Sequence, residues 1–431
     1  MTSPRHESPD DREIINAVDA LEDEAVDLLA TMVGFDSTLG NEAPAQAHIA
    51  GVFADLGLEV DRFELDLDAI RDHPGFSPVD WSVAGKENVV ATHRPRKGGG
   101  RSLILNGHID VVPTGPADMW TTPPFSPSIR EGRMHGRGAG DMKAGTVSYV
   151  MAFKALARLG LAPAATVHMQ SVVEEECTGN GALACLARGY RADAAVIPEP
   201  FDHSLMTAQM GVMWFRVHIR GKPAHVLDTS AGSNAIDAAF HLVAALKRLE
   251  KRWNAPDRRH PAYADFEHPI NFNLGLIEGG EWPSSVPTEC RFTMRVGFFP
   301  GIATAEVRRA IERTIKRASA RHPGLRETPP RIEYAGFQAE GCTVDAGGEM
   351  MLALADAHQR VIGSDPARQA TTATTDARFF NLYGGIPATC YGPRAERIHG
   401  IDESVDLASM RDVTRVLALF MAAWCGLEPA A

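Results

Sequence analysis

Several features that define other classes of protein are missing from this 431-residue sequence. No stretch approaches the ~18–20 uninterrupted apolar residues of a membrane-spanning helix, and the polar, acidic N-terminus lacks the apolar core of a secretory signal peptide. The six cysteines include no C-x-x-C pair, which favours free buried thiols. The net charge of −12, with no basic stripe, argues against nucleic-acid binding. These absences predict a cytoplasmic protein with no membrane or nucleic-acid partner.

The length and patterning of the chain predict two domains, because 431 residues exceed one ordinary hydrophobic core. Contents of 44% hydrophobic and 23% charged residues are typical of a globular protein. In the first half, helical periodicity alternates with buried-strand patterns at 88–92, 103–108, 166–173 and 194–197. This alternation predicts an α/β fold, with a mixed sheet flanked by helices.

The pattern changes near Gly211 and becomes that of a second, inserted domain. Strand-like segments at 212–219, 271–277, 289–296 and 331–334 are interrupted by helical periodicity at 234–253 and 304–320. The resulting β-α-β-β-α-β order predicts a ferredoxin-like α+β module. We therefore expect one domain formed by residues 1–210 and 339–431, and an inserted domain at 211–338.

Histidines and carboxylates gather where the predicted strands of the first domain end. His108 and Asp110 end one strand, Glu174–Glu176 follow another, and Glu199 follows a third. A structural histidine or a solvated charge run would explain any one of them. Together with Asp141 and a loop histidine, His399, they provide the nitrogen and oxygen ligands that suit zinc, manganese or cobalt. Ligands in open α/β sheets bind beyond the carboxyl ends of strands, so this arrangement predicts a metal site there.

Six motifs together resemble the M20 metallopeptidase family, which includes acetylornithine deacetylase, succinyl-diaminopimelate desuccinylase and carboxypeptidase G2. They span nearly the whole chain in the family's order: GHIDVVP (107–113), GRGAGDMKAG (136–145), EEECTGNGA (174–182), IPEP (197–200), GKPAHV (221–226) and HGIDESVDL (399–407). The resemblance implies a hydrolase of C–N amide bonds with two divalent metal ions, zinc being favoured over cobalt or manganese. It also implies that the inserted domain is a lid or dimerisation domain and that the protein is a homodimer.

The resemblance also implies a role for each site residue. The metal ligands would be His108, Asp141, Glu176, Glu199 and His399, with Asp141 bridging the two ions and followed by a cis peptide bond to Met142. Glu175 would be the general base, and Asp110 would orient His108. His225 of one subunit would stabilise the oxyanion in the active site of its partner.

The sequence indicates the substrate less closely than it indicates the metal ligands. Ser284 lies where many relatives carry an asparagine, and Arg378 is a candidate partner for a substrate carboxylate. The leading expectation is a small N-acyl or N-formyl compound, such as an N-acylated amino acid. Alternatives within the family are an aromatic-ring deformylase or aminohydrolase, weakly indicated by Trp282, and a carboxypeptidase or dipeptidase. An inactive binding or dimerisation homologue is the alternative of another class, which the complete set of expected ligands disfavours.

Overall fold

The larger sheet of the protein has six strands in the order β1-β2-β7-β3-β8-β17. The computed structural model describes residues 9–430, and its strands in this sheet are β1 (Glu59–Glu64), β2 (Glu87–His93), β3 (Leu103–His108), β7 (Val167–Val172), β8 (Ala194–Ile197) and β17 (Ala388–Cys390). β7, β3, β8 and β17 pair in parallel, whereas β1 and β2 pair antiparallel. The predicted mixed sheet is confirmed.

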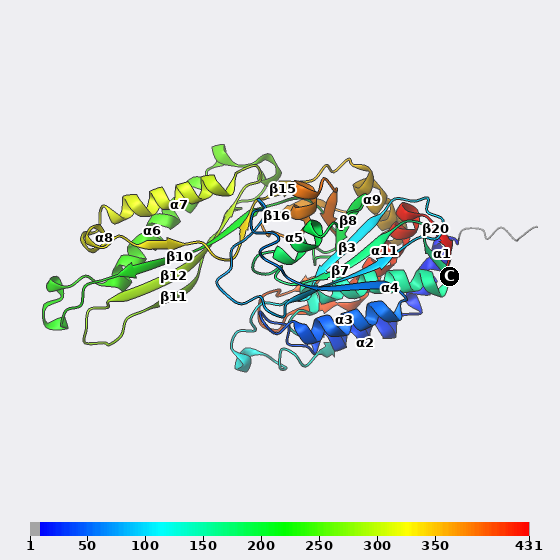
Figure 1. The fold of residues 1–431 in the computed structure, drawn as a ribbon, viewed down its shortest axis with the longest axis horizontal. Coiled ribbons are helices and arrows are strands. Elements are labelled where there is room, and N and C mark those ends of the chain that lie inside the picture. Colours follow the sequence, from blue (N-terminus) through cyan, green and yellow to red (C-terminus); the bar gives the residue numbers. More distant parts are fainter. Residues whose placement is uncertain (1–8, 431) are drawn as a thin grey trace, which may run out of the picture.

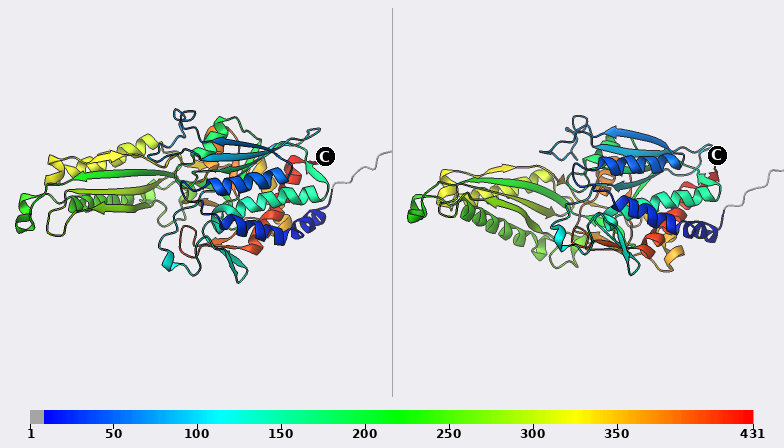
Figure 2. Two further views of the ribbon diagram at one scale, coloured as in Figure 1. Left: turned by 60° about the horizontal axis from the view of Figure 1, so that its bottom comes forward. Right: turned by 90° about the horizontal axis from the view of Figure 1, so that it is seen from below.

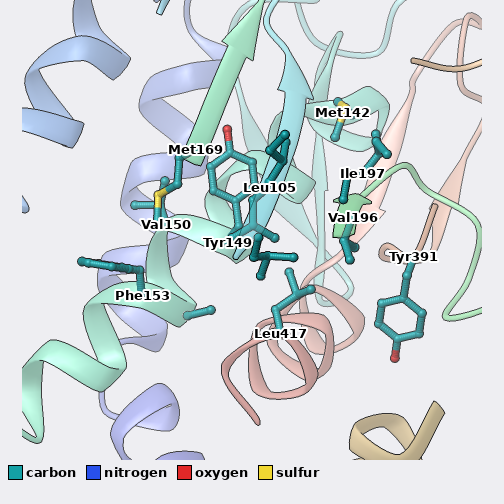
Figure 3. Close-up of a cluster of buried hydrophobic side chains, with 14 of the residues drawn as sticks. Leu105, Met142, Tyr149, Val150, Phe153, Met169, Val196, Ile197, Tyr391 and Leu417 are labelled. Atoms are coloured by element: carbon teal, nitrogen blue, oxygen red, sulfur yellow. The ribbon is translucent and has the colours of Figure 1, made fainter. Parts of the chain in front are cut away.

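Helices cover this sheet and bury its apolar side chains. They are α1 (Asp11–Asp19), α2 (Glu22–Val33), α3 (Ala43–Asp55), α4 (Ala144–Arg158), α5 (Asn180–Ala187), α9 (Glu349–Ile362), α10 (Ala377–Phe379) and α11 (Leu407–Cys425). Figure 3 shows Tyr149 of α4 and Leu417 of α11 beside Leu105 of β3 and Val196 of β8. All six residues of β3 are buried; the strand begins with the apolar run Leu103–Leu105 and ends in the polar tip Asn106-Gly107-His108.

Short strands join distant loops around the larger sheet. β9 (Leu205–Gln209) pairs with β15 (Cys342–Thr343) and β16 (Arg368–Thr371), and β6 (Leu161–Pro163) pairs with β20 (Leu427–Pro429). A four-stranded sheet contains β4 (Ser128–Arg130), β5 (Arg133–His135), β18 (Ala395–Glu396) and β19 (Ser404–Asp406). Since β5 precedes the glycine-rich segment and β19 follows the loop of His399, their pairing brings these two motif segments together.

The second sheet lies at the other end of the elongated molecule, far from α1 and the C-terminus (Figure 1 and Figure 2). Its order is β11-β12-β10-β13, all antiparallel, and β14 also pairs with β10. The strands are β10 (Gly211–Arg220), β11 (Phe272–Gly279), β12 (Glu289–Phe298), β13 (Arg331–Glu333) and β14 (Gln338–Ala339), with helices α6 (Ala235–Trp253), α7 (Thr304–Ser319) and α8 (Pro323–Glu327). This order is that of the predicted ferredoxin-like module.

The second sheet and its helices have a core of their own. Phe215, Phe292 and Leu242 are buried together there, separately from the core of the larger sheet. Ala208 and Ala370, which lie outside 211–338, pack into the same core. The limits of the inserted domain at residues 211 and 338 therefore stay a prediction.

All six cysteines are buried and free, as their scattered positions predicted. In the part of the chain from residue 9 to residue 430, no helix combines the length and apolar character needed to cross a membrane.

Candidate active site

The predicted metal ligands meet at one edge of the larger sheet. His108 is the last residue of β3, Glu175 and Glu176 follow the end of β7, and Glu199 follows the end of β8. Because β7, β3 and β8 are parallel neighbours, their carboxyl ends lie side by side and deliver these side chains to the same place. The buried apolar strands thus position a polar cluster at their tips.

The His108 imidazole is surrounded by three carboxylates. Its Nε2 lies 3.1 Å from Asp141 Oδ1, 3.7 Å from Glu199 Oε1 and 3.9 Å from Glu175 Oε2. One donor atom each from His108, Glu175 and Glu199 falls within 4.8 Å of the others, and the same holds for His108, Asp141 and Glu176. These two groups share His108.

His399 approaches the same cluster from the loop between β18 and β19. Its Nε2 lies 3.2 Å from Asp141 Oδ2 and 3.1 Å from Glu176 Oε2. The two oxygens of Asp141 therefore face two different histidines, His108 and His399. This is the arrangement that a carboxylate shared between two cations requires, and it matches the bridging position expected for Asp141.

The buried carboxylates of the cluster repel one another unless positive charge compensates them. Burial, reinforced by neighbouring carboxylates, raises the pKa of Glu175 and of Glu199 well above the usual range. Burial alone would lower the pKa of His399, but the adjacent Glu176 and Asp141 raise it to about 11. Glu175 Oε1 is buried without a hydrogen-bond partner among the described residues. The donor set thus fits divalent cations, which would relieve the repulsion between the carboxylates.

Asp110 supports the cluster differently from the expected contact with the His108 ring. His108 Nδ1 lies 2.9 Å from the backbone oxygen of Asp110 and 3.8 Å from the nearer carboxylate oxygen. The Asp110 carboxylate instead accepts the backbone N–H groups of Glu175, at 3.3 Å, and Glu176, at 3.1 Å. Asp110 therefore holds the turn that carries both glutamates, and its main chain orients the imidazole.

Glu403 fixes the backbone of the Asp141 segment. Its Oε1 accepts the N–H groups of Gly140 and Asp141, both at 3.0 Å, and its Oε2 accepts from Arg137 Nη1 at 2.6 Å. Arg137 and Glu403 are both buried. The expected cis peptide bond between Asp141 and Met142 is present. Since Glu403 lies four residues after His399, one short segment supplies a candidate ligand and clamps the backbone of another.

A buried ion cluster holds Glu174, the residue before the candidate base. Its carboxylate accepts from Lys86 Nζ at 3.0 Å, Trp81 Nε1 at 2.7 Å and Thr178 Oγ1 at 2.9 Å. Lys86 also donates to Glu42 at 2.9 Å. The long segment that precedes β2 therefore has a structural role, because it supplies Trp81 and Lys86 as supports for the Glu174–Glu176 turn.

A cavity of about 370 Å³ opens over the cluster. Asp141, Glu175, Glu176, Glu199 and His399 line its floor, and Pro200, Phe201, Asn271, Arg295, Thr372–Thr375 and Ile398 form the rest of its wall. Asn271 and Arg295 belong to the second sheet or its border and come from the same chain. Arg295 Nη2 has one long contact, 3.5 Å, to Thr372 O, and burial lowers the pKa of Arg295. The sequence analysis missed both residues, because an arginine in an alternating strand gives no signal of its own.

Arg378, the predicted partner of a substrate carboxylate, does not line this cavity. Its guanidinium is buried and donates to the backbone oxygens of Thr375, at 3.1 Å, and Thr178, at 2.8 Å. These bonds tie α10 to the turn that follows the glutamates, so the side chain has a structural use beneath the site.

His225 and Ser284 lie close together in two segments that connect elements of the second sheet and its helices, outside the cavity of their own chain. His225 forms an isolated antiparallel bridge with Ser285, and its Nδ1 accepts the N–H of Leu227 at 3.0 Å. Neither His225 nor Ser284 lines the cavity over the metal cluster. Within one chain, the structure therefore does not bring them to the other predicted site residues.

The motif segments and the geometry agree with comparisons to known proteins. Residues 104–423 match the family described as Peptidase family M20/M25/M40. The chain belongs to this family. Its members hydrolyse amide bonds, so the predicted hydrolase class and the family resemblance are confirmed.

Two relatives and one solved structure illustrate the range of the family. The chain is 28% identical to the N-formyl-4-amino-5-aminomethyl-2-methylpyrimidine deformylase of Halalkalibacterium halodurans, over 97% of this chain and 98% of that one. It is 26% identical to the succinyl-diaminopimelate desuccinylase of Thioalkalivibrio sulfidiphilus, over 91% and 96%. The structure of the dipeptidase Dug1p from Saccharomyces cerevisiae shares the fold, with a TM-score of 0.78, 14% identity, and coverage of 96% and 98%.

Proposed function

We propose that the protein hydrolyses the amide bond of a small N-acyl or N-formyl compound, using two divalent cations held at the tips of β3, β7 and β8. The observation that carries the proposal is the convergence of His108, Asp141, Glu176, Glu199 and His399 around a cavity that also exposes Glu175. His108, Asp141 and Glu199 would hold one cation. His399, Asp141 and Glu176 would hold the other, with zinc, cobalt and manganese all suited to these ligands.

Each residue then has a task in the reaction. Bound cations would polarise the amide carbonyl and make a water molecule more acidic. Glu175 takes a proton from the attacking water and passes it to the leaving nitrogen, as a general base and then a general acid. The Asp110 carboxylate keeps Glu175 in place by accepting a hydrogen bond from the backbone N–H group of Glu175. The cavity wall of Phe201 and Ile398 excludes water from one side of the substrate.

Arg295 favours a substrate whose amine part bears a carboxylate, as in an N-acylated amino acid. Its half-buried guanidinium has little hydrogen bonding within the protein and faces the cavity. A carboxylate can take two parallel hydrogen bonds from such a group. The full-length similarity to a deformylase supports a second candidate, an N-formyl aminomethylpyrimidine, which carries no carboxylate.

Replacing Arg295 with Met distinguishes the two candidates. For N-acetyl and N-succinyl amino acids, we expect KM to rise at least tenfold, because a charge-assisted hydrogen bond contributes about 1.5–3 kcal/mol. For a neutral N-formyl aminopyrimidine, kcat and KM should change little. The measurement is a steady-state comparison of these substrates with the metal-loaded enzyme.

Arg291 provides a matched control on the same strand, since it is exposed and pairs with Glu278 at 2.6 Å. Arg291→Met should leave all KM values unchanged. A wild-type enzyme that cleaves only the N-formyl aminopyrimidine would establish the second candidate, and one that cleaves none of these amides would remove the proposed function.

We also propose that the protein is a homodimer whose second sheet brings His225 to the partner's cavity. β11 is an edge strand of that sheet and exposes Leu276 (65%) and Ile277 (40%). Trp282 (68%) and Leu227 (90%) are also exposed, close in sequence to Ser284 and His225. Large apolar side chains exposed on one sheet are typical of an interface.

Two variants test the dimer and the role of His225 together. His225→Ala should leave the mass in light scattering at twice the single-chain value and lower kcat by about 10²–10³-fold, the effect of losing one oxyanion donor. Leu276→Asp should give a monomer with a similar loss of kcat, although His225 is intact. Leu352→Asp, at an exposed position of α9, should change neither quantity. Full activity in a monomer would contradict this role of His225.

A further inference from the structure

The outer face of α6 and α7 carries a basic groove that the proposed reaction does not use. A cavity of about 250 Å³ lies between the two helices, with Arg248 and Arg252 of α6 on one side. Arg317 of α7 and Arg321, just after its end, lie on the other side. All four arginines are exposed. We name these four arginines and the cavity between them the helix groove.

The arginines of the helix groove have no carboxylate partners within the described residues 9–430. None of the four forms an ion pair or a side-chain hydrogen bond there, whereas Arg188, also exposed, pairs with Asp61 at 2.7 Å. Glu250 of α6 points toward the sheet, where it accepts the N–H of Phe272 at 2.9 Å. The residues that line the groove include no acidic side chain.

Local helix energetics account for only part of this arrangement. Arg248 and Arg252 are four residues apart within α6, and like charges at that spacing repel each other on a helix. The helix dipole favours basic residues in the last turn, and this applies to Arg252 in α6 and Arg317 in α7. The helices are antiparallel, since His241 Nε2 near the start of α6 lies 3.0 Å from Ala318 O near the end of α7. The dipole therefore accounts for Arg252 and Arg317 but not for Arg248.

We propose that the helix groove binds a compact oligophosphate, meaning a soluble anion with two or three linked phosphate groups. A phosphate group carries about −1.5 to −2 charges at neutral pH, so two groups nearly balance four guanidinium groups. Guanidinium forks bind phosphate oxygens in pairs. The cavity has the volume of about eight water molecules at ~30 Å³ each, which suits a few phosphate groups but not a nucleic-acid duplex.

This site is separate from the amide-cleaving centre, so the two can be tested independently. Isothermal titration of the full-length, metal-loaded protein with inorganic triphosphate in excess Mg²⁺ should show binding that weakens as salt rises, because exposed charges are screened. The double variant Arg248→Gln/Arg317→Gln should bind at least tenfold more weakly while its amidase activity stays unchanged.

The control replaces Arg258 and Arg368 with Gln, two exposed arginines outside the groove, and should bind triphosphate with an unchanged Kd. Equal binding by the wild type and the groove variant would overturn the proposal, as would the lack of any binding by the wild type. A short RNA or DNA strand that binds more tightly than triphosphate, through the same arginines, would replace the oligophosphate with a nucleic acid. Loss of amidase activity without loss of triphosphate binding would concern only the proposed function.

Discussion

Glu175→Gln is expected to lower kcat by about 10²–10⁴-fold, the usual contribution of a positioned general base. Glutamine has the same shape but cannot accept the proton of the attacking water. Glu175 is suited to the task because burial raises its pKa well above the usual range and its Oε1 has no hydrogen-bond partner in the described part of the protein. Steady-state kinetics of the metal-loaded variant measure the effect.

Metal content provides the check that the loss is chemical. Replacing Glu175 is expected to leave both cations bound, so mass spectrometry should still find about two ions per chain. Glu175→Asp, which keeps the carboxylate but withdraws it by one methylene group, should retain more activity than Glu175→Gln. If Glu175→Gln kept activity within tenfold of the wild type, another residue would be the base.

The parts of the fold that could be predicted are those set by local patterns. β3, β7 and β8 were evident because each is a buried segment rich in apolar residues and leads into a polar motif. Parallel pairing then gathers the tips at one edge, so the cluster around His108 followed from a general property of α/β sheets. The alternating burial of β10 likewise reflects a sheet with one covered face.

The supports of the site could not be predicted, because they depend on contacts between distant segments. Lys86 and Glu174 are 88 residues apart, and nothing in either local sequence indicates their buried ion pair. Glu403 is 262 residues from Asp141, whose backbone it binds. Arg378 shows the same limit, because nothing in its local sequence indicates that its guanidinium donates to the backbone oxygens of Thr375 and Thr178.

The position of His225 also depends on how distant segments assemble, which its local sequence does not indicate. His225 is in the segment between β10 and α6, and the cavity over the metal cluster receives Asn271 and Arg295 of the same chain but not His225. A sequence motif identifies which residues a family uses, but it does not state which subunit supplies each one. The homodimer is thus a proposal that depends on the exposed edge strand and on the position of His225.

Asp141→Asn is expected to remove both cations, which is the largest effect on the metal centre. The two oxygens of Asp141 lie 3.1 Å from His108 Nε2 and 3.2 Å from His399 Nε2, so one carboxylate faces both histidines. An amide would keep the shape but lose the negative charge that both cations need. Metal analysis after dialysis should find well below one ion per chain, and kcat should fall to the background.

Glu176→Gln and Glu199→Gln are the matched controls, since each carboxylate belongs to one side of the pair. Each should lose roughly one ion and keep the other, because a two-metal site has separate terminal ligands. If Asp141→Asn retained one tightly bound ion, Asp141 would serve a single cation rather than a bridging position. The repulsion among Asp141, Glu175, Glu176 and Glu199 also predicts that removing the metal ions with a chelator lowers the melting temperature of the wild type more than that of Asp141→Asn.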